Sequence, residues 1–237
     1  MDPGRLLAPL VEAPRKSAIL LDVDGTLAPI VRHPELAAVP DETRTELQRL
    51  AGRYALVACI SGRTGADAAR LVGVAGLTYV GVHGLELAPE AERWRSAVQE
   101  LAAESGWPAE NKGLTVAFHF RGAGDETSAA AALERVAERA RSAGLVPTWG
   151  RKVLEVRPPV DADKGTAVAA LLESHRLERA LYAGDDTTDI DAFRGLAGAR
   201  HSVRIAIASE EGPAALREQA DLVLASPAEL LGVLRLL

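Results

Sequence analysis

Cysteine and long apolar runs are the clearest shortages in this sequence of 237 residues. The single cysteine, Cys59, excludes an internal disulfide, and its apolar neighbours predict a buried side chain in a reducing compartment. No apolar run approaches the roughly 18 residues that a membrane-spanning helix needs, and the residues up to Lys16 lack the core of a signal peptide. We therefore expect a soluble, cytoplasmic protein without a membrane partner.

An excess of positive charge is missing too. The formal net charge is −6 and the sequence pI is near 5.5, which argues against a nucleic-acid-binding surface. Internal repeats and low-complexity tracts are also missing. Hydrophobic residues make up 48% of the chain, and its mass of 25.0 kDa suits one large α/β domain or a core with a smaller inserted domain.

The most informative stretch runs from Ala18 to Leu27. Its apolar residues lead directly into Asp22, Val23 and Asp24, which are followed by Gly-Thr. Such a run predicts a strand buried on both faces of a parallel sheet, and ligands bind beyond the carboxyl ends of these strands. Residues two apart in an extended chain point the same way, so the carboxylates of Asp22 and Asp24 can lie close together. Their mutual repulsion favours the binding of a hard divalent cation between them. Alternatively, these are ordinary strand-end acids, one of them capping a turn.

Polar residues also follow two other predicted core strands. The strand predicted over residues 54–60 ends at Ser61, and Thr64 already supplies the cap of the next helix. Ser61 is therefore either available for binding or simply a turn residue. The strand predicted over residues 180–183 ends in the acidic sequence G-D-D-T-T-D, whose last residue is Asp189. Helix capping is the alternative role for that aspartate.

Lys164 lies in the first turn of a helix predicted to extend to about Ser174. A lysine there opposes the helix macrodipole, which favours acidic residues at this end. A local rule that is broken without visible compensation points to function. The alternative is a solvated lysine that costs about a few tenths of a kcal/mol.

The middle of the chain follows a different pattern. Residues 114–121 alternate between apolar and polar, which predicts a half-buried antiparallel strand. A helix predicted over residues 125–143 and a hairpin with strands at 145–149 and 152–156 complete a β-α-β-β unit. We interpret this unit as a domain inserted into the parallel-sheet core.

The predicted fold is therefore α/β, with a doubly wound, Rossmann-like parallel-sheet core and an inserted α+β cap. The expected boundaries are 1–86 for the first part of the core, 87–158 for the cap and 159–237 for the second part. The remaining predicted elements are helices over 41–52, 64–71, 94–104 and 227–237, strands over 77–82, 203–208 and 220–225, and a loop over 28–40.

The polar residues at these strand ends are the groups that hydrolysis of a phosphate monoester requires. The phosphate dianion repels an anionic nucleophile, so a divalent cation and a lysine must first neutralise it. A carboxylate nucleophile divides the displacement into formation and hydrolysis of an aspartyl phosphate. A second carboxylate can protonate the leaving alkoxide and later accept a proton from water.

The motifs D-V-D-G-T, I-S-G-R, D-K-G and G-D-D-T-T-D resemble, in this order, the four motifs of the haloacid dehalogenase superfamily of phosphohydrolases. The resemblance covers essentially the whole chain, and an insertion between the second and third motifs is where the C2-type cap of this superfamily lies. It implies Asp22 as nucleophile and Asp24 as general acid/base. The implied phosphate ligands are Ser61, Gly62 and Lys164. The implied cofactor is Mg²⁺, bound by Asp22, the carbonyl of Asp24 and Asp185, with support from Asp186 and Asp189.

Segments of the predicted cap resemble the trehalose-6-phosphate phosphatases. The sequence E-N-K-G…H-F-R over residues 110–121 is similar to their E-x-K-G…H-[YF]-R, and K-V-L-E-V-R-P over 152–158 is similar to K-x-x-E-x-R-P. D-G-T-L-A-P-I after the nucleophile and V-H-G at 82–84 also agree. The implied substrate contacts are Arg63, Glu110, Lys112, His119, Arg121, Lys152 and Glu155. The chain departs from the family at Val23, often Phe, and at Ile190, often Glu.

Strand alternation supports part of this set. His119 and Arg121 fall on one face of their strand, whereas Lys152 and Glu155 fall on opposite faces, so we expect Lys152 to reach in from the turn.

The hypothesis from sequence is Mg²⁺-dependent hydrolysis of trehalose 6-phosphate by a monomer whose partner is a small sugar phosphate. The nearest alternative is another capped sugar-phosphate phosphatase, acting on sucrose 6-phosphate or mannosyl-3-phosphoglycerate. A non-catalytic sugar-phosphate-binding module and a phosphotransferase or mutase are the alternatives from other classes.

Overall fold

The computed structural model describes residues 2–31, 36–121, 123–150, 152–208 and 212–237. The chain divides into two compact units, one of Met1–Leu87 with Ala162–Leu237 and the other of Ala88–Asp161. Each unit contains its own sheet and its own buried apolar cluster or clusters. The second unit is therefore an insertion between two segments of the first.

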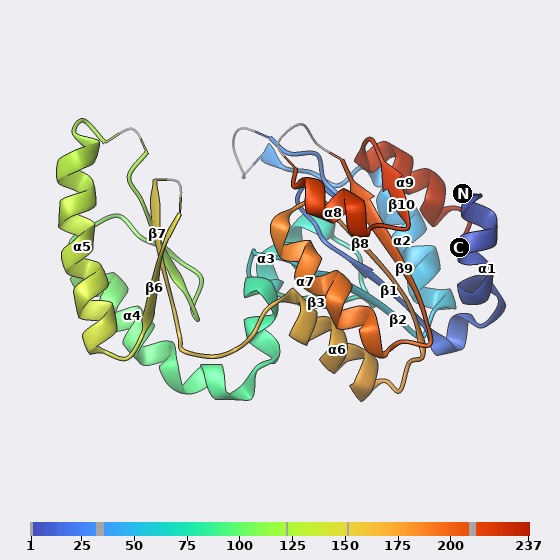
Figure 1. The fold of residues 1–237 in the computed structure, drawn as a ribbon, viewed down its shortest axis with the longest axis horizontal. Helices are drawn as coiled ribbons and strands as arrows, with labels where there is room; N and C mark the ends of the chain where they lie inside the picture. The colour runs from blue at the N-terminus through green and yellow to red at the C-terminus, as the bar shows by residue number, and fades with distance from the viewer. Residues whose placement is uncertain (1, 32–35, 122, 151, 209–211) are drawn as a thin grey trace. The chain divides into compact units, whose positions relative to one another are not determined.

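The first unit is built on a six-stranded sheet in which neighbouring strands run parallel (Figure 1). Its strands, in spatial order, are β10 (Leu222–Leu224), β9 (His201–Ile207), β8 (Arg179–Gly184), β1 (Ser17–Leu21), β2 (Leu56–Ile60) and β3 (Thr78–Val80). Strands β1 and β2 are buried along their whole length, as their apolar runs predict. Because β1 pairs in parallel with both β2 and β8, the residues after these three strands meet at one edge.

Helices cover both faces of this sheet (Figure 1). One face packs against α1 (Pro3–Glu12), α2 (Asp41–Arg53), α3 (Gly65–Val72) and α9 (Pro227–Leu234). The other face packs against α6 (Lys164–Ser174), α7 (Thr187–Gly195) and α8 (Ala214–Gln219). Successive residues of β1 point to alternate faces of the sheet. Ile19 and Leu21 belong to the apolar cluster on the face covered by α1, and Leu20 belongs to the cluster on the face covered by α6. The predicted doubly wound core is confirmed.

Two features of this unit differ from the expectations. Helices α1 and α8 were not predicted; α1 begins after the capping residue Asp2, and it buries Leu7 and Leu10 against the sheet. Strand β3 ends two residues earlier than predicted, because Val82 and His83 adopt left-handed backbone angles with φ of 50° and 53°.

The inserted unit has an antiparallel sheet in the order β4-β5-β7-β6. Its elements are β4 (Glu110–Asn111), β5 (Val116–His119), β6 (Val146–Gly150), β7 (Val153–Arg157), α4 (Arg95–Glu104) and α5 (Glu126–Ser142). Val116 and Phe118 of β5 pack against α4 and α5, so the helices cover one face of the sheet (Figure 1). Ala117 lies on the opposite face and is nevertheless buried, because it pairs with the longer Glu110 and Glu155 on the flanking strands. The predicted α+β insertion is confirmed.

Short 3₁₀ turns complete the two units, over Pro14–Lys16, Val82–Leu87, Pro89–Trp94 and Leu196–Gly198. Among the residues that the structure describes, no helix is long and apolar enough to cross a bilayer.

Candidate active site

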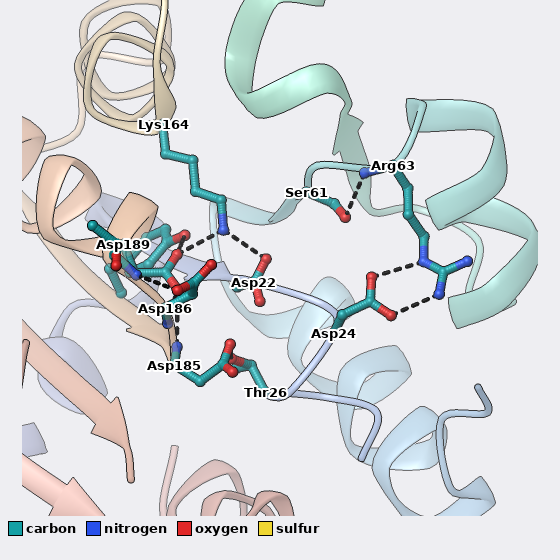
Figure 2. A network of polar contacts seen from close by, with 11 residues as sticks. Asp22, Asp24, Thr26, Ser61, Arg63, Lys164, Asp185, Asp186 and Asp189 are labelled. Carbon is teal, nitrogen blue, oxygen red and sulfur yellow. Dashed lines mark hydrogen bonds and ion pairs between the residues drawn. The ribbon is translucent and has the colours of Figure 1, made fainter. Parts of the chain in front are cut away.

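The acids predicted at the strand ends lie close together. Asp22 follows β1 and Asp185 follows β8, and the backbone N–H of Asp22 donates to the carbonyl of Ala183 at 2.9 Å. Asp189 comes from the first turn of α7. One carboxylate oxygen from each of these three aspartates lies within 4.8 Å of the other two (Figure 2). All three side chains are buried.

Lys164 reaches the same cluster although it is 142 positions from Asp22 in the chain. It is the first residue of α6, and its side chain is 3% exposed. Its Nζ donates to Oδ1 of Asp22 and to Oδ1 of Asp189, both at 2.7 Å (Figure 2). The two buried carboxylates compensate the unfavourable interaction between the charge of Lys164 and the positive end of the helix dipole. The solvated lysine considered as an alternative is wrong.

The charges in this cluster do not balance. Burial raises the pKa of Asp22 to about 6 despite the opposing effect of Lys164. Burial, with the added repulsion of Asp22 and Asp189, raises the pKa of Asp185 to about 8. Burial also opposes the charge of Lys164, but the two carboxylates that it contacts raise its pKa above the ordinary value. The cluster is therefore short of positive charge.

The donor set fits a hard divalent cation with oxygen ligands. The chain also approaches the cluster closely at Gly25, where φ is +83° and an added Cβ would lie 2.1 Å from Oδ2 of Asp185. Only glycine fits this position, because a side chain would displace the carboxylate. The resemblance implies Asp22, Asp185 and the backbone carbonyl of Asp24 as the ligands. Asp22 and Asp185 belong, with Asp189, to the group of buried carboxylates that could hold such an ion.

Asp189 and Asp186 occupy different positions around the start of α7. Asp186 caps the helix by accepting from the N–H of Thr187 at 2.7 Å. Asp189 is fully buried and accepts from Lys164, from the hydroxyl of Tyr182 at 2.6 Å, and from the N–H groups of Asp185 and Asp186 at 2.9 Å each. Capping therefore accounts for only part of its contacts.

The second predicted motif, I-S-G-R, spans the end of β2 and the turn after it. Ser61 follows β2, is 1% exposed, and accepts from the N–H of Arg63 at 3.1 Å. The guanidinium of Arg63 donates through Nε and Nη2 to both oxygens of Asp24 at 2.7 Å (Figure 2). Gly62 packs against His83, whose Nε2 would lie 2.6 Å from an added Cβ. The structure thus pairs the predicted acid/base with a residue predicted to bind substrate.

Comparison with known proteins identifies the family. A model of the trehalose-phosphatase family matches residues 20–228, which contain every motif described above. The chain belongs to the trehalose-phosphatase family.

Individual relatives of this trehalose-phosphatase chain agree with that assignment. It is 37% identical over 209 residues to the trehalose-phosphate phosphatase of Mycolicibacterium paratuberculosis, an alignment that covers 78% of this chain and 53% of that protein. The chain thus spans about half the length of the relatives that carry this name.

Solved structures are similar over nearly the whole chain. The Aspergillus fumigatus trehalose-6-phosphate phosphatase has a TM-score of 0.68 at 26% identity, with 99% of this chain and 96% of that chain covered. A haloacid dehalogenase-like hydrolase from Bacteroides thetaiotaomicron has a TM-score of 0.65 at 14% identity, with 92% and 98% covered. The latter similarity concerns the fold alone.

The two departures from the trehalose-phosphatase pattern lie in the core. Val23 and Ile190 are both buried, in the clusters on opposite faces of the sheet. Both positions thus hold apolar side chains in the core, and neither is one of the predicted catalytic residues.

Apart from Arg63, the residues that the resemblance implies as substrate contacts lie in the inserted unit. The structure brings some of them together. Nε2 of His119 lies 2.9 Å from Oε2 of Glu110, and Nζ of Lys112 lies 3.6 Å from Oε1 of the same residue. Glu155 pairs with Ala117, which in turn pairs with Glu110, so its strand position adjoins this group.

The other two implied residues of this unit lie next to the paired ends of β5 and β7. Lys152 has a φ of +63° and donates to Glu126 at the start of α5 at 2.8 Å. Arg121 follows β5 and is exposed.

Sequence reasoning missed Tyr182. It lies in the apolar strand β8 and contacts the cluster through its hydroxyl group. The signal was a tyrosine within a run expected to be fully buried, because a buried hydroxyl needs a hydrogen-bond partner.

The raised pKa values predict that Mg²⁺ stabilises the protein more at high pH than at low pH. Because the pKa values of Asp22 and Asp185 rise on folding from 3.8 to about 6 and about 8, the folded protein holds protons that the unfolded chain releases. The stability of the metal-free protein therefore falls as pH rises from about 4 to 8. A bound cation opposes this loss by neutralising the ionised carboxylates.

Thermal melting with EDTA or with MgCl₂, at matched ionic strength, measures this difference. The increase in Tm caused by Mg²⁺ should be greater at pH 8 than at pH 5 by about 4 °C or more. Equal increases at the two pH values would contradict the assignment of these carboxylates as the cation site.

Proposed function

We propose that the chain is a Mg²⁺-dependent phosphatase that hydrolyses trehalose 6-phosphate to trehalose and phosphate. The observation that carries this proposal is the contact between Lys164 and Asp22, with Asp185 beside them, in a chain of the trehalose-phosphatase family. Phosphoryl transfer to a carboxylate brings together a carboxylate nucleophile, a positively charged side chain and a metal ion. Asp22 supplies the first in this proposal, Lys164 the second, and Asp22 with Asp185 the carboxylate ligands of the third.

The two chemical steps follow from Asp22 and Asp24. An oxygen of Asp22 forms a bond to phosphorus as the bond from phosphorus to the sugar oxygen breaks, and Asp24 protonates the departing oxygen. Water then adds to phosphorus, Asp24 accepts its proton, and the bond to Asp22 breaks. Phosphate is released and both carboxyl groups return to their starting states. When bound, Mg²⁺ neutralises the negative charge of the phosphoryl oxygens and of its carboxylate ligands.

The remaining groups hold the phosphoryl oxygens and the acid/base. Lys164 is already fixed against Asp22 and supplies positive charge next to the attacked phosphorus. The Ser61 oxygen is held by the N–H of Arg63, so its hydroxyl proton can point toward a phosphoryl oxygen. We assign Arg63 to orienting Asp24 through its bidentate contact, in addition to contacting the substrate.

We assign recognition of the sugar to the inserted unit, as a cap domain over about residues 87–158. Support comes from the polar group around Glu110, Lys112 and His119, together with the family motifs that contain Arg121, Lys152 and Glu155. Sugars expose many hydroxyl groups, so a selective site needs several fixed polar side chains.

The substrate is tested by phosphate release from a panel of sugar phosphates. We expect kcat/KM for trehalose 6-phosphate to exceed that for sucrose 6-phosphate and mannosyl-3-phosphoglycerate by about 100-fold or more. EDTA should abolish the reaction and Mg²⁺ should restore it. Equal rates on all substrates would rule out the trehalose assignment.

The same assay separates the other candidate functions. A phosphorylated sugar product in place of free phosphate would indicate a phosphotransferase or mutase. Binding without turnover would indicate a sugar-phosphate-binding module.

We also infer a cytoplasmic monomer that acts on a small molecule. The support for a reducing compartment is that Cys59 is the single cysteine of the sequence and is free, so the chain has no internal disulfide. Light scattering on the purified chain tests the monomer.

A further inference from the structure

Tyr182 places a hydroxyl group beneath the proposed catalytic cluster. It is fully buried in β8, on the sheet face that packs against α6 and α7. Its ring packs edge-on against Phe193 of α7, with ring centroids 6.1 Å apart. The hydroxyl donates to Oδ1 of Asp189 at 2.6 Å, a short bond of the kind formed with a carboxylate. Burial and the neighbouring carboxylates raise the pKa of Tyr182, so the group stays protonated and remains a donor.

Asp189 has all of its acceptor positions in use. Lys164 and Tyr182 donate to Oδ1, and the N–H groups of Asp185 and Asp186 donate to Oδ2. A carboxylate offers about four acceptor positions, so this arrangement leaves none for a metal ion. Asp189 therefore connects the groups around the metal, and Asp22 and Asp185 remain as the carboxylate ligands.

The elements that Asp189 connects are packed backbone to backbone. An added Cβ on Gly165 in α6 would lie 2.3 Å from the carbonyl oxygen of Asp191 in α7. One on Gly195 of α7 would lie 2.3 Å from the carbonyl oxygen of Gly165. The start of α6 is thus fixed against the middle and the end of α7, and Tyr182 supplies the contact from the sheet.

We propose that Tyr182 is a positioning residue for the phosphatase site. Its hydroxyl fixes the carboxylate of Asp189, which holds Lys164 against Asp22 and orders the backbone that carries Asp185. This inference rests on the proposed function, but its effect on Mg²⁺ binding can be measured without substrate.

The test is Tyr182→Phe, which removes the hydroxyl and keeps the ring. The dissociation constant for Mg²⁺, measured by calorimetry without substrate, should rise about tenfold, as observed when partners of metal ligands are lost. The kcat should fall about tenfold, the effect of losing one hydrogen bond to a charged group, and KM should stay unchanged because the fully buried Tyr182 is not accessible to a substrate.

Two variants control for packing and stability. Tyr54→Phe removes the hydroxyl of another buried tyrosine, which donates to the carbonyl of Leu237 at 3.0 Å, and should leave Mg²⁺ affinity and kcat unchanged. Phe193→Leu loosens the packing of Tyr182 without removing its hydroxyl, and should lower the melting temperature with a smaller effect on Mg²⁺ affinity than Tyr182→Phe. All measurements are made well below the melting temperature of each variant.

Unchanged Mg²⁺ affinity and kcat in Tyr182→Phe would overturn the proposal, as would equal losses of Mg²⁺ affinity in Phe193→Leu. If the unmodified protein hydrolysed no sugar phosphate, the proposed function would fail, whereas the comparison of Mg²⁺ affinities would still decide the role of Tyr182.

Discussion

Asp22→Asn should lower kcat by about 10⁴-fold or more, because the amide that replaces the carboxylate cannot form the aspartyl phosphate. The side chain keeps its size at a buried position, so the fold is retained. Binding of trehalose 6-phosphate, measured by calorimetry, should also be retained. Phosphate release under saturating Mg²⁺ gives the rate.

The control for this variant is Asp191→Asn, on the next turn of α7 after the site. Asp191 pairs with Arg194 and stands outside the cluster, so its substitution should leave the rate within about twofold. Turnover by Asp22→Asn at the unmodified rate would show that another group attacks phosphorus.

Lys164→Met should damage both activity and stability. It leaves the buried Asp22 and Asp189 without their cation, and breaking a buried ion pair from one side costs about 3–5 kcal/mol of unfolding free energy. Loss of the charge beside the phosphoryl group should lower kcat by about 10²–10³-fold. Urea unfolding in EDTA and phosphate release measure the two effects separately.

The loss of stability in Lys164→Met should depend on pH. Without the lysine, the raised pKa of Asp22 rises further, so protonation at pH 5 relieves the uncompensated charge more than at pH 8. Lys152→Met removes a lysine from the exposed pair with Glu126 and should change stability by at most about 1 kcal/mol. A loss in Lys164→Met no larger than in Lys152→Met would contradict the buried ion-pair assignment.

The strand ends could be predicted from sequence because strands buried on both faces appear as continuous apolar runs. A polar residue that directly follows such a run lies at the sheet edge, and parallel strands share that edge. The pattern therefore predicts the positions of Asp22, Ser61 and Asp185 at that edge. It also singled out Lys164, because its position breaks the preference of a helix start for acidic residues.

Side-chain partners could not be predicted in the same way. The pairing of Arg63 with Asp24 depends on torsion angles of a long side chain, which the residue pattern does not determine. Tyr182 occupies a strand position that any large core residue could fill, and its partner Asp189 lies on the following helix. Val82 adopts a left-handed conformation that a β-branched residue disfavours, and its N–H donates to the carbonyl of Arg63 at 2.8 Å, a contact between separate loops that the local sequence does not reveal.

The strand order has a consequence for synthesis on the ribosome. Strand β1 lies between β2 and β8, yet β8 is translated only after the whole inserted unit. The inserted unit has its own apolar cluster and can become compact before β8 is synthesised. Until then, one side of β1 lacks its hydrogen-bonding neighbour. An exposed strand edge promotes association between chains, so we expect the nascent polypeptide to be most prone to association in the interval between the synthesis of β2 and that of β8.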